Sequence, residues 1–247
     1  MAKIDIKNIN ALIKLILIII FLSINIKIIN AEPSGPTITF ISNETKNPAA
    51  AALINTSGGS ITMVILNGTT QNPRWKAYVG NITGTLTLDD ANDNTIFDWT
   101  LTDVIGEIYA TRTSSTINWS GVNCSNSTHI ANENIALNHT NKDDNITATF
   151  DGTTHQGFFT GTREILANTC FSVHTYVNST SQTANFEEIV LYDGTNETNG
   201  NIVYATPLEQ DAYGFDNNTY DFQMIVPEVG LATWTSSTAY YFYAELT

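Results

Sequence analysis

Twelve asparagines in this 247-residue chain stand in the pattern Asn-x-Ser/Thr, the acceptor pattern for N-linked sugar. The composition alone would place about six such patterns by chance. The excess predicts N-linked glycosylation, and the alternative is that a chain rich in Asn and Thr generates accidental matches. The predicted acceptors are Asn43, Asn55, Asn67, Asn81, Asn118, Asn123, Asn126, Asn138, Asn145, Asn178, Asn196 and Asn217.

Two cysteines, Cys124 and Cys170, are the next candidates for chemistry. An even pair in an exported protein predicts a disulfide bond. Closing a loop of this length would restrict the unfolded chain by about 4 kcal/mol. The sequence holds no CxxC, Cys/His cluster or haem motif, so metal and redox roles are not indicated for this pair.

One stretch resembles part of a calcium loop. The run Asp90–Asn94 matches the first half of the D-x-N-x-N pattern, but Thr95 replaces the required glycine and Leu101 stands where a bidentate Glu should be. The pattern therefore favours a plain hairpin turn. No metal ligand set and no cofactor is predicted.

Enzyme constellations are also missing from the sequence. It has no Gly-x-Ser-x-Gly elbow, no His-Glu-x-x-His and no phosphate-binding Gly-rich loop before a helix. Glu187 and Glu188 are neighbours on an expected strand, so they would point to opposite faces and not form an acid/base pair. We predict no catalytic residue. The four histidines are scattered: His129, His139, His155 and His174.

The elements that would position these residues are almost all strands. Short runs rich in β-branched and aromatic residues alternate with Asn-, Asp- and Gly-containing turns. The fold class predicted is all-β, an antiparallel β-sandwich of the Ig-like or jelly-roll-like kind, in a single elaborated domain. The expected strands are 37–42, 60–66, 74–79, 85–88, 95–101, 107–112, 116–119, 146–150, 157–160, 171–177, 187–192, 202–205, 220–226 and 239–246.

Three regions receive more specific expectations. Pro48–Ile54 is the one stretch where a short helix is expected, and Ser120–Asn145 is expected to be a long exposed polar loop. Ala239–Leu246 carries apolar groups on both faces, which suits a central strand or an interface strand. The expected domain limits are 1–31 for a signal peptide, 32–47 for an N-terminal segment and 48–247 for the sandwich.

The amino end predicts export. A segment with Lys3, Lys7 and Lys14 runs into the apolar block from Leu15 to Ile26, which has the length of a signal core and is too short to cross a bilayer. Cleavage is expected after Ala31. The alternative is an uncleaved anchor, and both place the rest of the chain outside the membrane, in an extracellular, cell-surface location.

The net charge of the chain excludes some classes of binding partner. Residues 32–247 keep 6 of the 10 basic and 23 of the 24 acidic residues, so their formal charge is −17. Nucleic acid and anionic lipid would be repelled. The surface is therefore expected to be made mostly of neutral polar groups and added sugar.

Three segments carry a resemblance: PRWKAYVGNITG at 73–84, IFDW at 96–99 and YYFYAEL at 240–246. They resemble a group of uncharacterised secreted β-rich surface proteins of archaea. The resemblance implies an archaeal cell surface, where Asn-linked sugar coats S-layers and extracellular filaments. It carries no site residue over to this chain.

Two function classes are left open. The first is a glycosylated structural subunit that self-assembles, as a homo-oligomer or polymer, into a filament or lattice. The second is a carbohydrate-binding or adhesin module that recognises a cell-surface glycan through exposed indoles. The candidate indoles are Trp75, Trp99, Trp119 and Trp234.

A route to assembly is suggested by Thr37–Ser42. Ile38 and Phe40 alternate with threonines there, as in a half-buried strand. Such a strand either pairs within its own sandwich or is donated to the open sheet edge of a neighbour. Ile38 and Phe40 are the predicted assembly residues.

Overall fold

The computed structural model describes residues 32–101, 103–114, 117–139, 143–177, 180–181, 185–194, 199–229 and 237–247. Its elements are β1 (Trp75–Gly80), β2 (Thr85–Asp89), β3 (Thr95–Thr100), β4 (Gly106–Thr111), η1 (Trp119–Gly121), β5 (Asn123–Cys124), α2 (Ser127–Ala136), α3 (Ile146–Thr149), β6 (Phe158–Thr160), β7 (Arg163–Ile165), β8 (Ser172–His174), β9 (Tyr176–Val177), β10 (Thr180–Ser181), β11 (Glu187–Tyr192), β12 (Ile202–Pro207), β13 (Ala212–Tyr213), β14 (Thr219–Tyr220), β15 (Phe222–Pro227) and β16 (Tyr241–Leu246).

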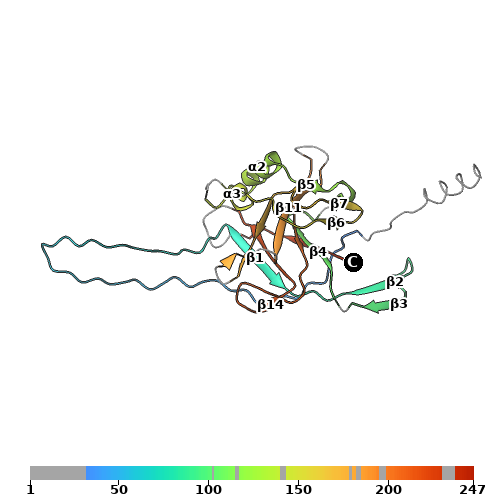
Figure 1. The fold of residues 1–247 in the computed structure, drawn as a ribbon, viewed down its shortest axis with the longest axis horizontal. Helices are drawn as coiled ribbons and strands as arrows, with labels where there is room; N and C mark the ends of the chain where they lie inside the picture. The colour runs from blue at the N-terminus through green and yellow to red at the C-terminus, as the bar shows by residue number, and fades with distance from the viewer. Residues whose placement is uncertain are drawn as a thin grey trace, which may run out of the picture. The chain divides into compact units, whose positions relative to one another are not determined.

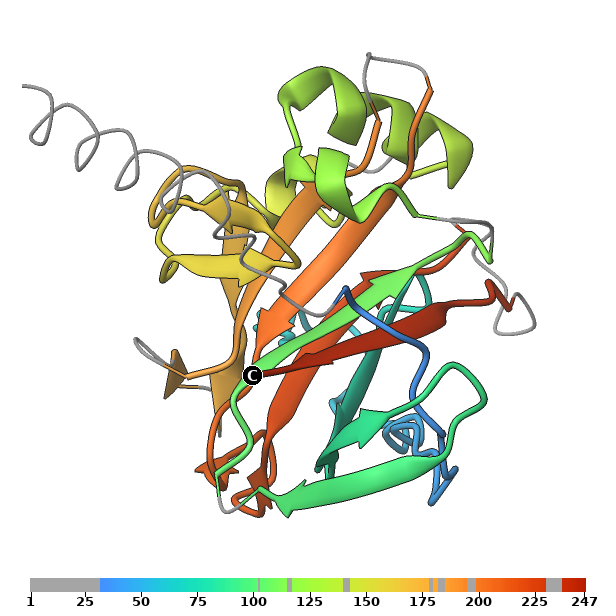
Figure 2. The same ribbon diagram turned by 90° about the vertical axis from the view of Figure 1, so that its right-hand side faces the viewer.

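A six-stranded sheet forms the centre of the fold. Its strand order is β16-β4-β12-β11-β5, with β8 also paired to β11, and the pairs are antiparallel. Figure 2 shows β4 in green between the red β16 and an orange strand. The expected antiparallel, β-rich fold is confirmed.

Both faces of this sheet are buried because side chains alternate along its inner strands. On β12, Ile202 and Tyr204 belong to one apolar cluster, whereas Val203 and Ala205 belong to the other. The first cluster is closed by β1, β15, α2 and α3. The second is closed by Trp119 and by residues around β6 and β7. Strands buried on both faces read as continuous apolar runs.

The two-stranded β1–β15 sheet packs on the first face. Met224 and Val226 of β15 are fully buried there, and Trp75 and Tyr78 of β1 pack against the same cluster. The register pairs Tyr78 with Met224. This layer fixes the position of β1, and the segment that precedes β1 carries the candidate site.

Several predictions between residues 117 and 150 were wrong. Ile146–Thr149 is the short helix α3, and Trp119–Gly121 is a 3-10 turn. The expected polar loop contains α2, which begins with a capping box between Asn126 and His129. Its apolar signal was present but sparse, since Ile130 and Leu137 are seven residues apart and both are buried.

Three expectations between residues 37 and 66 were also wrong for the isolated chain. Thr37–Ser42 and Ser60–Leu66 form no strand, and Pro48–Ile54 forms no helix. Ile38 and Phe40, expected to be half-buried, are 64% and 75% exposed. These segments lie in an extended excursion that leaves the body before β1 (Figure 1).

The last strand, expected to be a central or an interface strand, is not central within the chain. β16 lies at the edge of the six-stranded sheet, where it pairs with β4 on one side. On its other side the structure shows an isolated bridge from Ala244 to Ser34. A terminal strand rich in aromatics therefore serves as an edge strand of the single chain.

Residues 32–247 form one compact unit. Within the described ranges, no helix is long and apolar enough to cross a membrane. The expected signal peptide, residues 1–31, lies outside the described residues.

Candidate assembly site

The excursion from Gly35 to Pro73, called the arm below, is held at its amino end by β16. The Ser34 N–H donates to the Ala244 carbonyl at 3.0 Å, and the Ala244 N–H donates back at 2.8 Å. The preceding Pro33 is buried. The arm therefore starts from a fixed point on the sheet edge.

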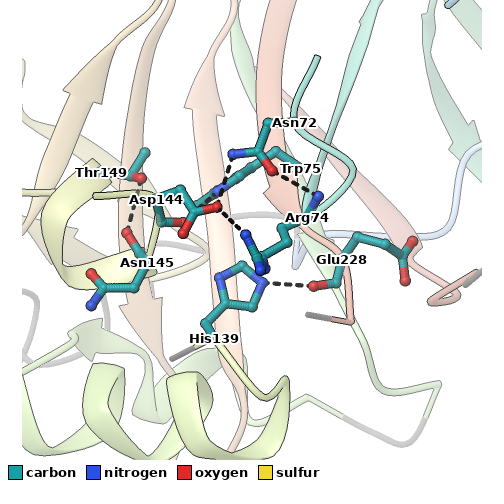
Figure 3. A network of polar contacts seen from close by, with 8 residues as sticks. All are labelled: Asn72, Arg74, Trp75, His139, Asp144, Asn145, Thr149 and Glu228. Atoms are coloured by element: carbon teal, nitrogen blue, oxygen red, sulfur yellow. Dashed lines mark hydrogen bonds and ion pairs between the residues drawn. The ribbon is translucent and has the colours of Figure 1, made fainter. Parts of the chain in front are cut away.

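Its carboxyl end is held by a polar network (Figure 3). The Arg74 guanidinium binds the Asp144 carboxylate at 2.7 Å, and the Asn72 amide donates to the same oxygen at 3.2 Å. The Trp75 indole N–H donates to the Asp144 carbonyl at 2.7 Å. Because side chains from the loop before α3 bind both sides of Pro73, the exit of the arm is as firmly placed as its start.

A second part of this network fixes β1 beneath the exit. The Glu228 N–H donates to the Arg74 carbonyl at 2.6 Å, and the Glu228 carbonyl accepts from His139 Nε2 at 2.6 Å. The His139 ring also meets Trp75 edge-on, with 5.7 Å between ring centroids. His139 therefore has a structural role, and it supports the anchor of the arm.

The arm has two limbs, which contact each other near the body and are joined at the far end by a pair of glycines. The Lys46 N–H donates to Gln71 Oε1 at 2.6 Å, and both residues line a shallow groove that also contains Phe215. At the far end Gly59 has a φ of +79°, a backbone conformation that favours glycine. Residues 47–68, which lie between Lys46 and Gln71, are exposed.

The exposed part of the arm is strongly apolar. Its second limb carries Ile61, Met63 and Ile65, which are between 94% and 102% exposed. Burying one such side chain stabilises a protein by about 1.5–3 kcal/mol. Burial of these three side chains in a contact would therefore contribute about 5–9 kcal/mol, which the isolated chain lacks. Exposed apolar segments that favour the strand conformation are templates for pairing with another chain. The isolated chain therefore presents an unsatisfied binding segment.

Charge is absent from the same region. Residues 47–73 contain no Asp, Glu, Lys or Arg, although the chain is strongly acidic. A neutral arm can approach an acidic surface without electrostatic repulsion, whereas the body could not. This run of 27 uncharged residues was visible in the sequence, and it was the signal that could have identified the arm.

The predicted glycosylation sites are spread over the described surface. Nine of them are exposed, and Asn145 is half-buried. Asn126 and Asn145 cap α2 and α3, because the side-chain oxygen of each accepts a backbone N–H of its helix. Asn178 and Asn196 lie outside the described residues. The nine exposed ones are Asn43, Asn55, Asn67, Asn81, Asn118, Asn123, Asn126, Asn138 and Asn217.

We expect native protein to be heavier than the polypeptide of residues 32–247, with sugar on turn sites such as Asn67, Asn126, Asn145 and Asn196. Mass spectrometry before and after chemical deglycosylation measures the difference. The control is the chain made in a host without N-glycosylation. A native mass equal to that of the bare polypeptide would contradict the prediction.

The cysteines and the remaining histidines form structural contacts. Cys124 and Cys170 are joined by a disulfide, as predicted. His155 accepts the N–H of Thr169 and Cys170 through Nε2 and donates through Nδ1 to the Gln156 carbonyl. The ring therefore holds the loop that carries Cys170. His129 stacks on Tyr192, well away from this loop in the sequence.

The buried carboxyl groups are more unusual. Glu107 on β4 and Glu245 on β16 are directly opposite each other, and both are buried. Burial, and then the nearby Glu245 carboxylate, raise the pKa of Glu107 to about 8. Glu245 accepts the N–H of Gly161 at 2.9 Å. These neighbouring acids make the stability of the sheet depend on pH.

Glu187 and Glu188 are used separately, as the alternation predicts. Glu187 accepts the Gln156 N–H at 2.7 Å, whereas Glu188 accepts the Ile225 N–H of β15 at 2.8 Å. Burial raises the pKa of Glu188 well above its usual value. Glu188 thereby links β11 of the central sheet to β15.

The half-match to a calcium loop is a hairpin turn. The Asp90 carboxylate accepts the N–H of Asn92 at 2.8 Å and that of Asn94 at 2.9 Å, and β2 pairs with β3 on either side. Among the residues that the structure describes, no three His, Cys, Asp or Glu side chains are grouped to hold a metal ion.

The interpretation of the candidate site rests on its geometry, because comparisons with known proteins found no match. No family model matches the chain, and neither a curated protein nor a solved structure matches it.

Proposed function

We propose that this chain is a secreted, N-glycosylated structural subunit that self-associates into a filament or lattice at a cell surface. The observation that carries the proposal is the arm, an apolar segment that is uncharged from residue 47 to residue 73, anchored at both ends and exposed between them. A monomer would gain nothing from such a segment, because exposed apolar strands promote association.

Other features support the same proposal. The twelve acceptor patterns fit a protein that meets the outside of the cell, and the predicted signal would take it there. The β1–β15 layer on the central sheet would serve as a sandwich-like scaffold. The Cys124–Cys170 disulfide suits an oxidising compartment. Thr37–Ser42, with Ile38 and Phe40, would take part in the association from the first limb.

We expect the secreted protein to form particles larger than a monomer as its concentration rises. Sedimentation velocity and electron microscopy of the purified protein measure this directly. A deglycosylated sample is the control for sugar-mediated contacts. Protein that stays monomeric at every accessible concentration would overturn the proposal.

A carbohydrate-binding module is the second candidate. It is favoured by the exposed ring pair of Phe97 and Trp99 on β3, whose centroids are 4.9 Å apart, because sugar rings stack on exposed indoles. Trp119 is buried, which removes it from the candidate indoles, and Trp234 lies outside the described residues. Binding to a glycan array without self-association would support this candidate.

A further inference from the structure

The β2–β3 hairpin has one apolar face and one polar face. The register places Leu86 opposite Trp99 and Leu88 opposite Phe97, so these four side chains share a face. All four are exposed, by 38% to 57%. The other face carries threonines and Asp98, and it is polar apart from Ile96, which is 79% exposed. An isolated two-stranded hairpin is only marginally stable in water. Packing of another segment on this apolar face would therefore stabilise the hairpin.

The arm contains a segment with the matching pattern. In Ser60–Leu66, the side chains of Ile61, Met63 and Ile65 recur at every second position, as on one face of an extended strand. They are the most exposed apolar group of the second limb. The chain thus carries two unpartnered apolar surfaces of similar length, one on the arm and one on the hairpin.

Charge favours pairing between them over other partners. The hairpin and its turn carry Asp89, Asp90, Asp93 and Asp98, with no Lys or Arg between residues 77 and 111. A second acidic surface would be repelled, whereas the uncharged run at residues 47–73 of the arm is not. This part of another copy can therefore approach the hairpin without an electrostatic cost.

The arm and the hairpin are connected to opposite ends of β1. The arm enters Trp75 from the anchor formed by Arg74 and Asp144, and the hairpin follows Gly80 after a short connection. In Figure 1 the arm and the hairpin extend away from the body on opposite sides of β1. This arrangement suits head-to-tail contacts between copies, which generate open polymers.

We propose that Ser60–Leu66 of one copy docks on the apolar face of the β2–β3 hairpin of a second copy, through Ile61, Met63 and Ile65 against Leu86, Leu88, Phe97 and Trp99. The inference rests on the proposed function, because it names the contact by which copies would join.

Paired variants of the secreted protein test this contact. The arm variant is Ile61→Thr/Ile65→Thr, and the hairpin variant is Leu86→Thr/Leu88→Thr. Threonine is β-branched, so it favours the strand conformation, and it adds no charge. Leu53→Thr/Ile54→Thr, on the first limb, is the matched control. Near-ultraviolet circular dichroism and the intact disulfide mass verify folding of each protein.

Each test variant should weaken self-association at least about tenfold, and the control should stay within about twofold of the unchanged protein. A mixture of arm and hairpin variants should form one-to-one dimers that do not grow, since only one junction can form. Sedimentation velocity distinguishes these species. Such dimers would establish docking between copies.

The other outcomes separate the two proposals. If the unchanged protein and both variants assemble equally, docking at this contact is overturned and the structural-subunit proposal stands. If the variants and their mixture are all monomeric, the arm is not received by a second copy's hairpin, and the inference fails. If the unchanged protein never assembles, both proposals fail. Arm-dependent binding to phosphatidylcholine vesicles by a monomer would also overturn both.

Discussion

Replacing Glu107 with Gln is expected to stabilise the protein at pH 8 and to flatten the fall of its stability between pH 4.5 and 8. Glu107 lies on β4 directly opposite Glu245, and burial raises its pKa from 4.5 to about 8. The unfolded chain releases this proton near pH 4.5, whereas the folded chain keeps it until about pH 8.

The direction of the effect follows from that difference. Between these two pH values the folded state binds more protons than the unfolded state, so each step up in pH favours unfolding. The contribution of Glu107 is fully present below pH 4.5 and is lost as pH rises to about 8. The total loss is on the order of 3–5 kcal/mol, at about 1.4 kcal/mol per pH unit.

Denaturant unfolding at several pH values measures this dependence. Glu107→Gln should remove the part of the slope that Glu107 contributes, because glutamine has no proton to lose, and the part that comes from buried Glu188 should remain. The matched control is Glu164→Gln, which alters an exposed carboxylate on β7. Parallel curves for the unchanged protein and Glu107→Gln would contradict the assignment to this pair.

The loss of stability that we expect at acidic pH has a different cause. Although burial opposes ionisation of Glu228, hydrogen bonds from Thr238 and Lys76 lower its pKa to about 2. The stability that Glu228 contributes is present above pH 4.5 and is lost as pH falls towards 2. Together the two groups place the stability maximum near pH 4.5.

Reducing the disulfide should have an effect of similar size. Cys124 and Cys170 enclose a sequence separation of 46 residues, so their bond restricts the unfolded chain by about 4 kcal/mol in the entropic model. For a unit of this size, the loss corresponds to a fall of roughly 8–16 °C in melting temperature. Calorimetry of oxidised and reduced protein measures it.

Comparing two redox forms of the unchanged chain keeps the side-chain volume the same, which matters because Cys170 is fully buried. Cys124→Ser/Cys170→Ser is the control for reagent effects, and its melting temperature should be the same with and without reductant. Equal melting temperatures for oxidised and reduced protein would show that the bond does not constrain the unfolded state.

Local pattern predicted the strands that are rich in β-branched and aromatic residues. Glu187–Tyr192 and Thr95–Thr100 form within a residue or so of their expected limits, because β-branched and aromatic side chains favour a pleated surface. The pattern failed at Ile146–Thr149, where the same residue types form a helical turn capped by Asn145. There the cap and burial of Ile146 outweigh β-propensity.

By itself the sequence determined the β-rich class, the disulfide and the uncharged run at 47–73, since composition and alternation depend only on neighbouring residues. Only the tertiary structure decided which apolar runs find a partner within the chain. Ser60–Leu66 and Glu187–Tyr192 are both good strand sequences, yet one is exposed and the other is fully buried. The difference arises because strand pairing depends on where distant segments meet, and Asp144 and Ala244 fix the ends of the arm so that its middle lies in solvent.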